Sequence, residues 1–149
     1  MGEEGSAVRL RTVVIAYQDD SWVKDLSNSL DGTGYRIETT KMVSEVIRKV
    51  RGRDACLVLL DDRMEEIKAC DLVPLFKKIN PRVQIIVVSA EEPIGWVKRL
   101  RDGGIFYQAM KPVDLAEIRS AVACAFEKIE REQPRDTLMP FLIPGSVPA

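Results

Sequence analysis

The chain alternates between short apolar runs and longer segments in which apolar residues recur at helical spacing. Five of the short runs predict strands, because they are rich in β-branched and other apolar residues. These runs are Val13–Tyr17, Tyr35–Thr39, Cys56–Leu60, Val83–Val88 and Ile105–Ala109. The third and fourth are apolar almost throughout, which is typical of strands that a parallel sheet buries on both faces.

The segments between and after these runs predict amphipathic helices, because their apolar residues fall three or four positions apart. In chain order, these apolar positions are Val23, Leu26 and Leu30; Val43, Val46, Ile47 and Val50; Leu72, Leu75, Phe76 and Ile79; Ile94, Val97 and Leu100; and Leu115, Ile118, Val122, Phe126 and Ile129. We expect Ser21 to cap the first helix. Asp114 and Glu117 have the spacing of a capping box at the start of the last helix.

Strands and helices alternate, and the connections between strands are too long for hairpins. This order predicts an α/β fold, a doubly wound five-stranded parallel sheet with helices on both faces. The length of 149 residues suits one domain. We expect an N-terminal extension over 1–9, a folded domain over 10–132 and a proline-rich apolar tail over 133–149. The tail is either disordered or docks on its own domain or on a partner.

Composition narrows the classes of function. A net charge of -1 gives no electrostatic case for binding nucleic acid or a membrane surface. Histidine is absent, which excludes histidine-based catalytic triads and most zinc sites. The spacing of the three cysteines is not typical of a metal site. We expect all three, Cys56, Cys70 and Cys124, to be reduced residues of the core. The short acidic start and the lack of a bilayer-length apolar stretch predict a cytoplasmic protein, given a prokaryotic source.

Polar side chains follow four of the predicted strands where those strands end: Asp19-Asp20, Asp61-Asp62, Ser89 and Lys111. Each has a simple explanation on its own, such as solvating a turn. Together they are expected at one edge of the sheet, where open α/β folds bind ligands. Clustered carboxylates without histidine or cysteine suit Mg²⁺, and an aspartate is then the natural nucleophile for a phosphoryl group.

This ordered set resembles the receiver domain of bacterial two-component response regulators, the CheY-like superfamily with a flavodoxin-like fold. The resemblance covers about residues 10–131. Gln18-Asp19-Asp20 resembles the acidic cluster after the first strand, and Ser89-Ala90 and Lys111-Pro112 resemble the motifs after the fourth and fifth. The family usually has a cis bond before that proline. The spacing of Asp61 to Met64 selects Asp61 over Asp62 as the phosphoacceptor.

The resemblance implies a role for each matching position. Asp61 would accept phosphate from a histidine kinase, a phosphotransfer protein or a small phosphodonor. Asp19, Asp61 and the backbone carbonyl of Arg63 would ligate Mg²⁺. Ser89 would hydrogen-bond the phosphoryl group, and Lys111 would form an ion pair with it. The response would be a shift of the face formed by the fourth helix, fifth strand and fifth helix, through which a homodimer could also form.

Three positions depart from the family pattern. Gln18 stands where a second acidic residue is usual; it can reach a metal only through water, so we expect weaker Mg²⁺ binding. Glu65 replaces the usual proline after the phosphoacceptor loop methionine. Gln108 stands where an aromatic switch residue is usual, and Phe106 or Tyr107 could serve only with a shifted register.

We therefore expect a phosphorylatable receiver that is not an enzyme, has no output domain of its own and signals through a downstream protein partner. The alternative is a receiver-like binding module that no longer signals by phosphorylation, with Gln18 and Gln108 as its signs. A third alternative is an enzyme on a doubly wound fold, such as a small hydrolase. The absence of histidine and of a glycine-rich phosphate loop argues against it.

Overall fold

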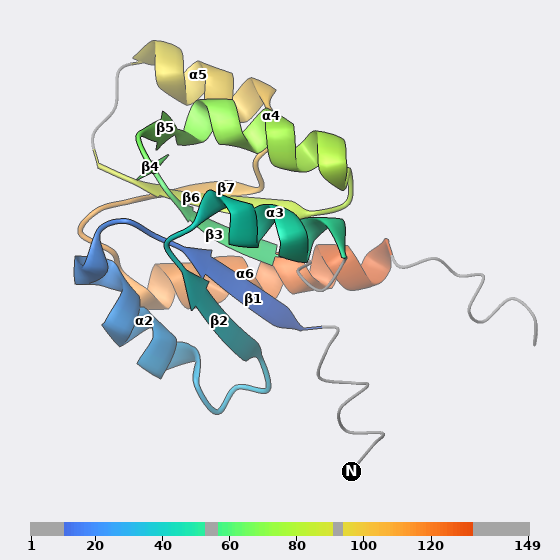
Figure 1. Cartoon of the computed structure of the whole chain (residues 1–149). Helices are drawn as coiled ribbons and strands as arrows, with labels where there is room; N and C mark the ends of the chain where they lie inside the picture. The colour runs from blue at the N-terminus through green and yellow to red at the C-terminus, as the bar shows by residue number, and fades with distance from the viewer. Residues whose placement is uncertain (1–10, 53–56, 91–93, 133–149) are drawn as a thin grey trace, which may run out of the picture.

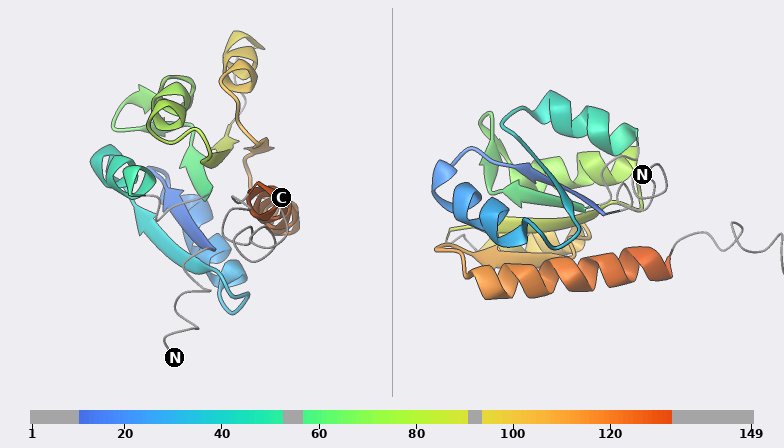
Figure 2. Two further views of the ribbon diagram at one scale, coloured as in Figure 1. Left: turned by 90° about the vertical axis from the view of Figure 1, so that its right-hand side faces the viewer. Right: turned by 90° about the horizontal axis from the view of Figure 1, so that it is seen from below.

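The computed structural model describes residues 11–52, 57–90 and 94–132, which form three layers. A parallel sheet lies in the middle with helices packed on both of its faces (Figures 1 and 2). The predicted doubly wound α/β fold is confirmed. The N-terminal extension, the proline-rich tail and Cys56 lie outside the described residues.

The sheet has five parallel strands in the order β2-β1-β3-β6-β7. Their bounds are Thr12–Ala16 for β1, Arg36–Thr40 for β2, Leu57–Asp61 for β3, Gln84–Ser89 for β6 and Tyr107–Met110 for β7. Strand β3 is central and every residue in it is buried. The fifth strand begins two residues later than the start of the predicted run Ile105–Ala109, and Phe106, just before it, packs against the core.

The helices divide the core into two halves. They are the 3-10 turn η1 (Asp20–Trp22), α2 (Val23–Leu30), α3 (Val43–Arg51), α4 (Ala69–Ile79), α5 (Ile94–Asp102) and α6 (Leu115–Arg131). Helices α2 and α6 cover one face, while α3, α4 and α5 cover the other (Figure 2). Strand β3 contributes Leu57 and Leu59 to the first half and Val58 and Leu60 to the second, as the alternation of a strand requires.

A short antiparallel hairpin follows β3 and was not predicted. Its strands are β4 (Arg63–Met64) and β5 (Ile67–Lys68). The connecting residues Glu65 and Glu66 both have positive φ, 50° and 69°, in the left-handed region that side chains other than glycine seldom adopt. Met64, in β4, is fully buried and anchors the hairpin to the core.

Two expected helix caps have different outcomes. Ser21 does not cap the first helix: the carboxylate of Asp19 accepts a hydrogen bond from Ser21 N at 2.9 Å and caps η1 instead. The chain enters α2 through this 3-10 turn, which moves the capping position two residues earlier. Asp114 caps α6 as predicted, accepting from the main-chain nitrogens of Ala116 and Glu117 at 3.0 and 3.2 Å.

Some expected core positions are exposed. Cys70 is buried as predicted, but Cys124 is exposed, because the buried face of α6 passes through Val122, Ala125 and Phe126 and leaves position 124 outside it. Ile94 is 85% exposed at the start of α5, of which only Leu100 is buried. No helix among the described residues is long and apolar enough to cross a membrane.

Candidate functional site

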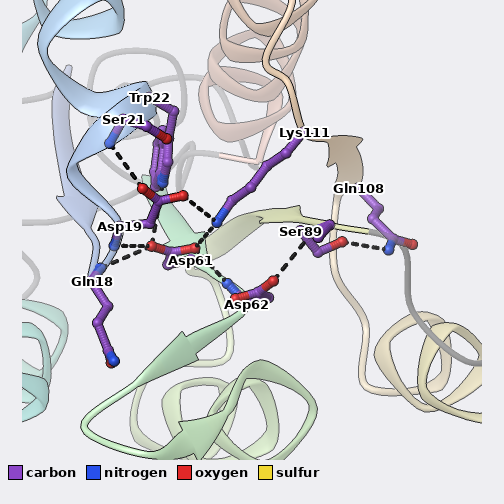
Figure 3. Close-up of polar contacts among 10 residues, drawn as sticks. Gln18, Asp19, Ser21, Trp22, Asp61, Asp62, Ser89, Gln108 and Lys111 are labelled. Atoms are coloured by element: carbon purple, nitrogen blue, oxygen red, sulfur yellow. Dashed lines mark hydrogen bonds and ion pairs between the residues drawn. The ribbon is translucent and has the colours of Figure 1, made fainter.

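The predicted site residues meet at the carboxyl edge of the sheet. Gln18 and Asp19 follow β1, Asp61 is the last residue of β3, Ser89 is the last of β6 and Lys111 follows β7 (Figure 3). The parallel order of β1, β3, β6 and β7 places all four strand ends at one edge. The peptide bond between Lys111 and Pro112 is cis, in agreement with the resemblance.

Asp61 is buried to 1% exposure, and one of its two carboxylate oxygens accepts three hydrogen bonds. Oδ2 accepts from the main-chain nitrogens of Gln18 at 2.8 Å and Asp19 at 2.9 Å. The indole nitrogen of Trp22 donates to the same oxygen at 3.3 Å. A buried carboxylate needs such donors, because burying an unpaired charge is costly. The sequence analysis did not identify Trp22, which stands four residues before Leu26.

The other oxygen of Asp61 faces a cation. Lys111 Nζ lies 2.8 Å from Asp61 Oδ1 and 3.1 Å from Asp19 Oδ2, so it bridges the two carboxylates. The main-chain nitrogen of Asp62 also donates to Oδ1, at 3.0 Å. Burial disfavours the charged form of Lys111, but the hydrogen bonds to Asp61 and Asp19 outweigh it and raise the pKa of Lys111.

Asp19 is strongly acidic although it is partly exposed. The main-chain hydrogen bond from Ser21 is the largest cause, followed by the Ser21 hydroxyl and then Lys111, and together they lower the pKa of Asp19 to about 2. Asp19 therefore stays ionised throughout the physiological pH range.

Two of the positions that depart from the family pattern contact each other. The side-chain oxygen of Gln18 accepts a hydrogen bond from Glu65 N at 2.9 Å, on the side away from Asp61 (Figure 3). The carboxylate of Glu65 in turn accepts from Val43 N at 3.3 Å. Gln18 thus joins β1 to the hairpin after β3, and its oxygen is already engaged.

The remaining departure, Gln108, contacts the predicted site serine. Ser89 is fully buried, and its Oγ accepts a hydrogen bond from Gln108 Nε2 at 3.0 Å across the neighbouring strands β6 and β7. Tyr107 points outward, and its hydroxyl donates to Glu117, which raises the pKa of Tyr107. Tyr107, the aromatic residue of this strand, therefore turns away from Ser89, and the side-chain amide of Gln108 contacts it instead.

A pocket of about 400 Å³ opens over Asp61. Its lining residues are Gln18, Asp19, Asp61, Asp62, Arg63, Lys68 and Trp96. Lys68 Nζ lies 4.0 Å from the centre of the Trp96 ring, in cation–π geometry. Lys68 and Arg63 add two positive charges to a lining that also holds three carboxylates. Sequence analysis missed Lys68 and Trp96, because neither follows a strand or belongs to a motif.

Asp62 has a structural role at the rim. Its carboxylate accepts a hydrogen bond from Ala90 N at 3.2 Å, which ties the residue after β6 to the loop after β3. Its main-chain oxygen accepts from Ala69 N at 2.9 Å at the start of α4. These contacts fix Asp62 and Ala90, the residues that directly follow Asp61 and Ser89.

The donor set for a metal consists of oxygen atoms. Within the described ranges, no three His, Cys, Asp or Glu side chains lie close enough to form a metal site. Asp19 and Asp61 are the two carboxylates that face each other, and both contact Lys111. One or two carboxylates with additional oxygen ligands suit Mg²⁺, which retains several waters. The residues therefore fit this ion with two anionic ligands.

Comparison with known proteins identifies the family. The model of the response regulator receiver domain matches residues 13–123. The chain belongs to the response regulator receiver domain family. As a receiver domain of two-component systems, it is a homologue of the NtrC and ZraR regulators. Homologous receiver domains are phosphoacceptors rather than conventional enzymes.

Curated relatives are longer than this chain. The DNA-binding transcriptional regulator NtrC of Azospirillum brasilense is 32% identical over 111 residues, which are 74% of this chain and 23% of the relative. The transcriptional regulatory protein ZraR of Escherichia coli K12 is 26% identical over 141 residues, or 92% of this chain and 32% of the relative. The chain thus spans about a quarter to a third of the length of these relatives.

Solved structures support the fold. A CheY-like receiver domain protein from Methanospirillum hungatei has a TM-score of 0.75 at 19% identity, covering 83% of this chain and 98% of that one. The beryllofluoride-activated NtrC4 receiver domain dimer, solved in solution, has a TM-score of 0.73 at 20% identity and covers 80% and 98% of the respective chains.

Proposed function

We propose that this receiver domain accepts a phosphoryl group on Asp61 from a histidine kinase or a phosphotransfer protein. The observation that carries the proposal is the bridge formed by Lys111, whose Nζ lies 2.8 Å from the buried Asp61 and 3.1 Å from Asp19. A cation fixed beside a carboxylate at the open edge of the sheet can neutralise charge on an incoming phosphoryl group.

The neighbouring residues have complementary roles. Asp61 acts as the nucleophile and forms an acyl phosphate. Lys111 moves with the phosphoryl group as its counter-ion, and the Ser89 hydroxyl donates to a phosphoryl oxygen. Asp19, Asp61 and the backbone carbonyl of Arg63 would hold Mg²⁺. The ion would neutralise charge between the carboxylates and the phosphoryl group.

The response would pass to a downstream protein partner through the face formed by α5, β7 and α6. Large apolar side chains are exposed there: Ile94 is 85%, Met110 46% and Tyr107 37% exposed. Exposed apolar side chains on these elements would suit a protein partner or a second copy of the chain. The cytoplasmic location and the domain boundaries remain predictions from the sequence.

Phosphorylation of the protein tests this proposal. The protein is incubated with Mg²⁺ and acetyl phosphate, and intact mass is followed over time. We expect one phosphoryl adduct on the wild type and none on Asp61→Asn. Asp62→Asn is the matched control, because it removes the adjacent carboxylate and should keep the adduct. No adduct on the folded wild type, or an adduct that persists in Asp61→Asn, contradicts the proposal.

A second candidate, a binding module that does not use phosphate, is favoured by two observations. Asp61 is only 1% exposed and already accepts five hydrogen bonds, while the oxygen of Gln18 is engaged by Glu65. Nuclear magnetic resonance with Mg²⁺ and beryllofluoride separates the two candidates. Shifts of the Ser89 and Lys111 amides indicate phosphoacceptor chemistry, and an unchanged spectrum favours the binding module.

A further inference from the structure

The two oxygens of Asp61 have unequal surroundings. Oδ2 accepts from two consecutive main-chain nitrogens, of Gln18 and Asp19, and from the indole nitrogen of Trp22. Two of these donors belong to the backbone, and the third belongs to a side chain that is only 4% exposed. Oδ1 accepts from Asp62 N and from Lys111, whose long side chain can move.

This asymmetry distinguishes the reacting oxygen. Lys111 can follow an arriving phosphoryl group and release Oδ1, whereas the donors to Oδ2 are two main-chain amides and a buried indole, which have less freedom to move. Oδ1 is then the nucleophile, and Oδ2 becomes the carbonyl oxygen of the acyl phosphate. In phosphorylation, Oδ1 bonds to phosphorus, and the bond from phosphorus to the donor breaks with its electron pair leaving on the donor.

Hydrolysis returns negative charge to Oδ2. A water oxygen attacks phosphorus, the Oδ1–phosphorus bond breaks and its electron pair returns to the carboxylate. Both water protons leave on the phosphate as H₂PO₄⁻. Oδ2 thus carries part of a negative charge when Asp61 is free and none when it is phosphorylated. A hydrogen bond to an ionised acceptor is roughly twice as strong as one to a neutral acceptor.

We propose that the indole N–H of Trp22 disfavours the phosphorylated state relative to the free one by stabilising the free carboxylate at Oδ2. The inference rests on the proposed phosphorylation of Asp61. Trp22 is a positioning residue here, because it contacts the oxygen that does not react. Of the three donors to Oδ2, it is the one that a side-chain substitution can remove.

The test compares two rates. Trp22→Phe retains an aromatic ring and removes the donor. We expect the ratio of the phosphorylation rate to the hydrolysis rate to rise about five-fold, from the difference between a charged and a neutral hydrogen bond. Acetyl phosphate and Mg²⁺ supply the forward rate by intact mass. Removal of acetyl phosphate on a desalting column starts the measurement of hydrolysis.

Two further variants separate the hydrogen bond from packing. In the first, 3-benzothienylalanine introduced at position 22 keeps the bicyclic shape while sulfur replaces the N–H, so it should reproduce the raised ratio. In the second, Phe126→Leu loosens the same half of the core at the opposite edge of the sheet, where Phe126 stacks on Tyr35. It should lower the melting temperature and leave the ratio unchanged.

The outcomes distinguish the two proposals. A raised ratio in both position-22 variants, with an unchanged ratio in Phe126→Leu, supports the role of Trp22. A ratio equal to that of the wild type in the benzothienyl protein overturns it, while phosphorylation of Asp61 stands. A wild type that takes no phosphoryl group overturns the proposed function, and the role of Trp22 with it.

Discussion

Gln108 donates a hydrogen bond from its side-chain amide to the hydroxyl oxygen of Ser89, at 3.0 Å, across the last two strands of the sheet. The hydroxyl proton of Ser89 remains available to donate elsewhere. A serine that accepts from an amide is polarised, which strengthens the bond it donates. This contact links a residue at the proposed phosphorylation site to strand β7, whose outer side chains Tyr107 and Met110 are exposed.

Replacing Gln108 by methionine should destabilise the protein. Methionine has a similar size but cannot donate, so the buried hydroxyl of Ser89 loses its partner. We expect the free energy of unfolding to fall by about 1–2 kcal/mol, measured by urea denaturation. In the Ser89→Ala background the same substitution should cost much less, because both partners are then apolar. Equal costs in the two backgrounds would show that the bond contributes nothing.

An aspartate at position 18 should strengthen Mg²⁺ binding. Gln18→Asp adds one anionic group to the lining of the pocket that holds Asp19 and Asp61, and we expect the affinity to rise by at least about five-fold. Titration calorimetry with MgCl₂ measures it. Gln18→Asn is the matched control, because it has the size of aspartate without the charge and loses the contact with Glu65 equally. A similar gain in both variants would exclude charge as its cause.

Removing the Lys111 side chain should destabilise the protein, because the carboxylates of the site need a cation. Lys111→Met leaves the buried Asp61 without its counter-charge, and we expect a loss of about 3 kcal/mol in the free energy of unfolding. Mg²⁺ should restore part of that loss, since it binds the same carboxylates. Lys98→Met breaks an exposed pair with Asp102 and should cost less than about 0.5 kcal/mol. A Lys111 variant as stable as Lys98→Met would mean that the bridge is not stabilising.

The low pKa of Asp19 predicts a loss of stability in acid. Its folded value is about 2 and its unfolded value is near 3.8. The stabilising contribution is therefore complete above pH 3.8 and disappears as the pH falls through about 2. Because 42% of the side chain is exposed, we expect less than about 1 kcal/mol.

The comparison with Asp19→Asn isolates this contribution. Asparagine can still accept the capping hydrogen bond from Ser21 N, so the variant removes the charge and retains the cap. Urea denaturation at several pH values should show the wild type as the more stable protein near neutrality and the difference closing in acid. A difference that is constant with pH would contradict the assignment.

Much of this site was predictable because it depends on strand order. Apolar runs identified β3 and β6, and polar residues at strand ends identified Asp61, Ser89 and Lys111, which parallel strands bring to one edge. The hairpin over 63–68 was not predictable in this way. Its turn places Glu65 and Glu66 in the left-handed region, and neither residue type signals that conformation.

Contacts between side chains were harder to predict than the placement of residues at strand ends. Trp22 stands at helical spacing from Leu26, which predicts a buried ring. The spacing does not identify the acceptor of its indole N–H. Cys124 was expected in the core, yet the rotation of α6 leaves it exposed, because apolar spacing locates a helical face only to within about one residue on either side. The hydrogen bond between Gln108 and Ser89 depends on the register of β6 and β7, which the sequence does not specify.

The central position of β3 has a consequence for local unfolding. Its main-chain amides pair with β1 and β6, and its side chains enter both halves of the core, so they should exchange with solvent only when the whole domain opens. Strand β7 has one neighbour within the described sheet and two exposed side chains, and its amides should exchange through smaller openings. Asp61 is thus anchored in the most slowly opening part of the domain, while the face proposed to transmit its state is carried by a part that opens more readily.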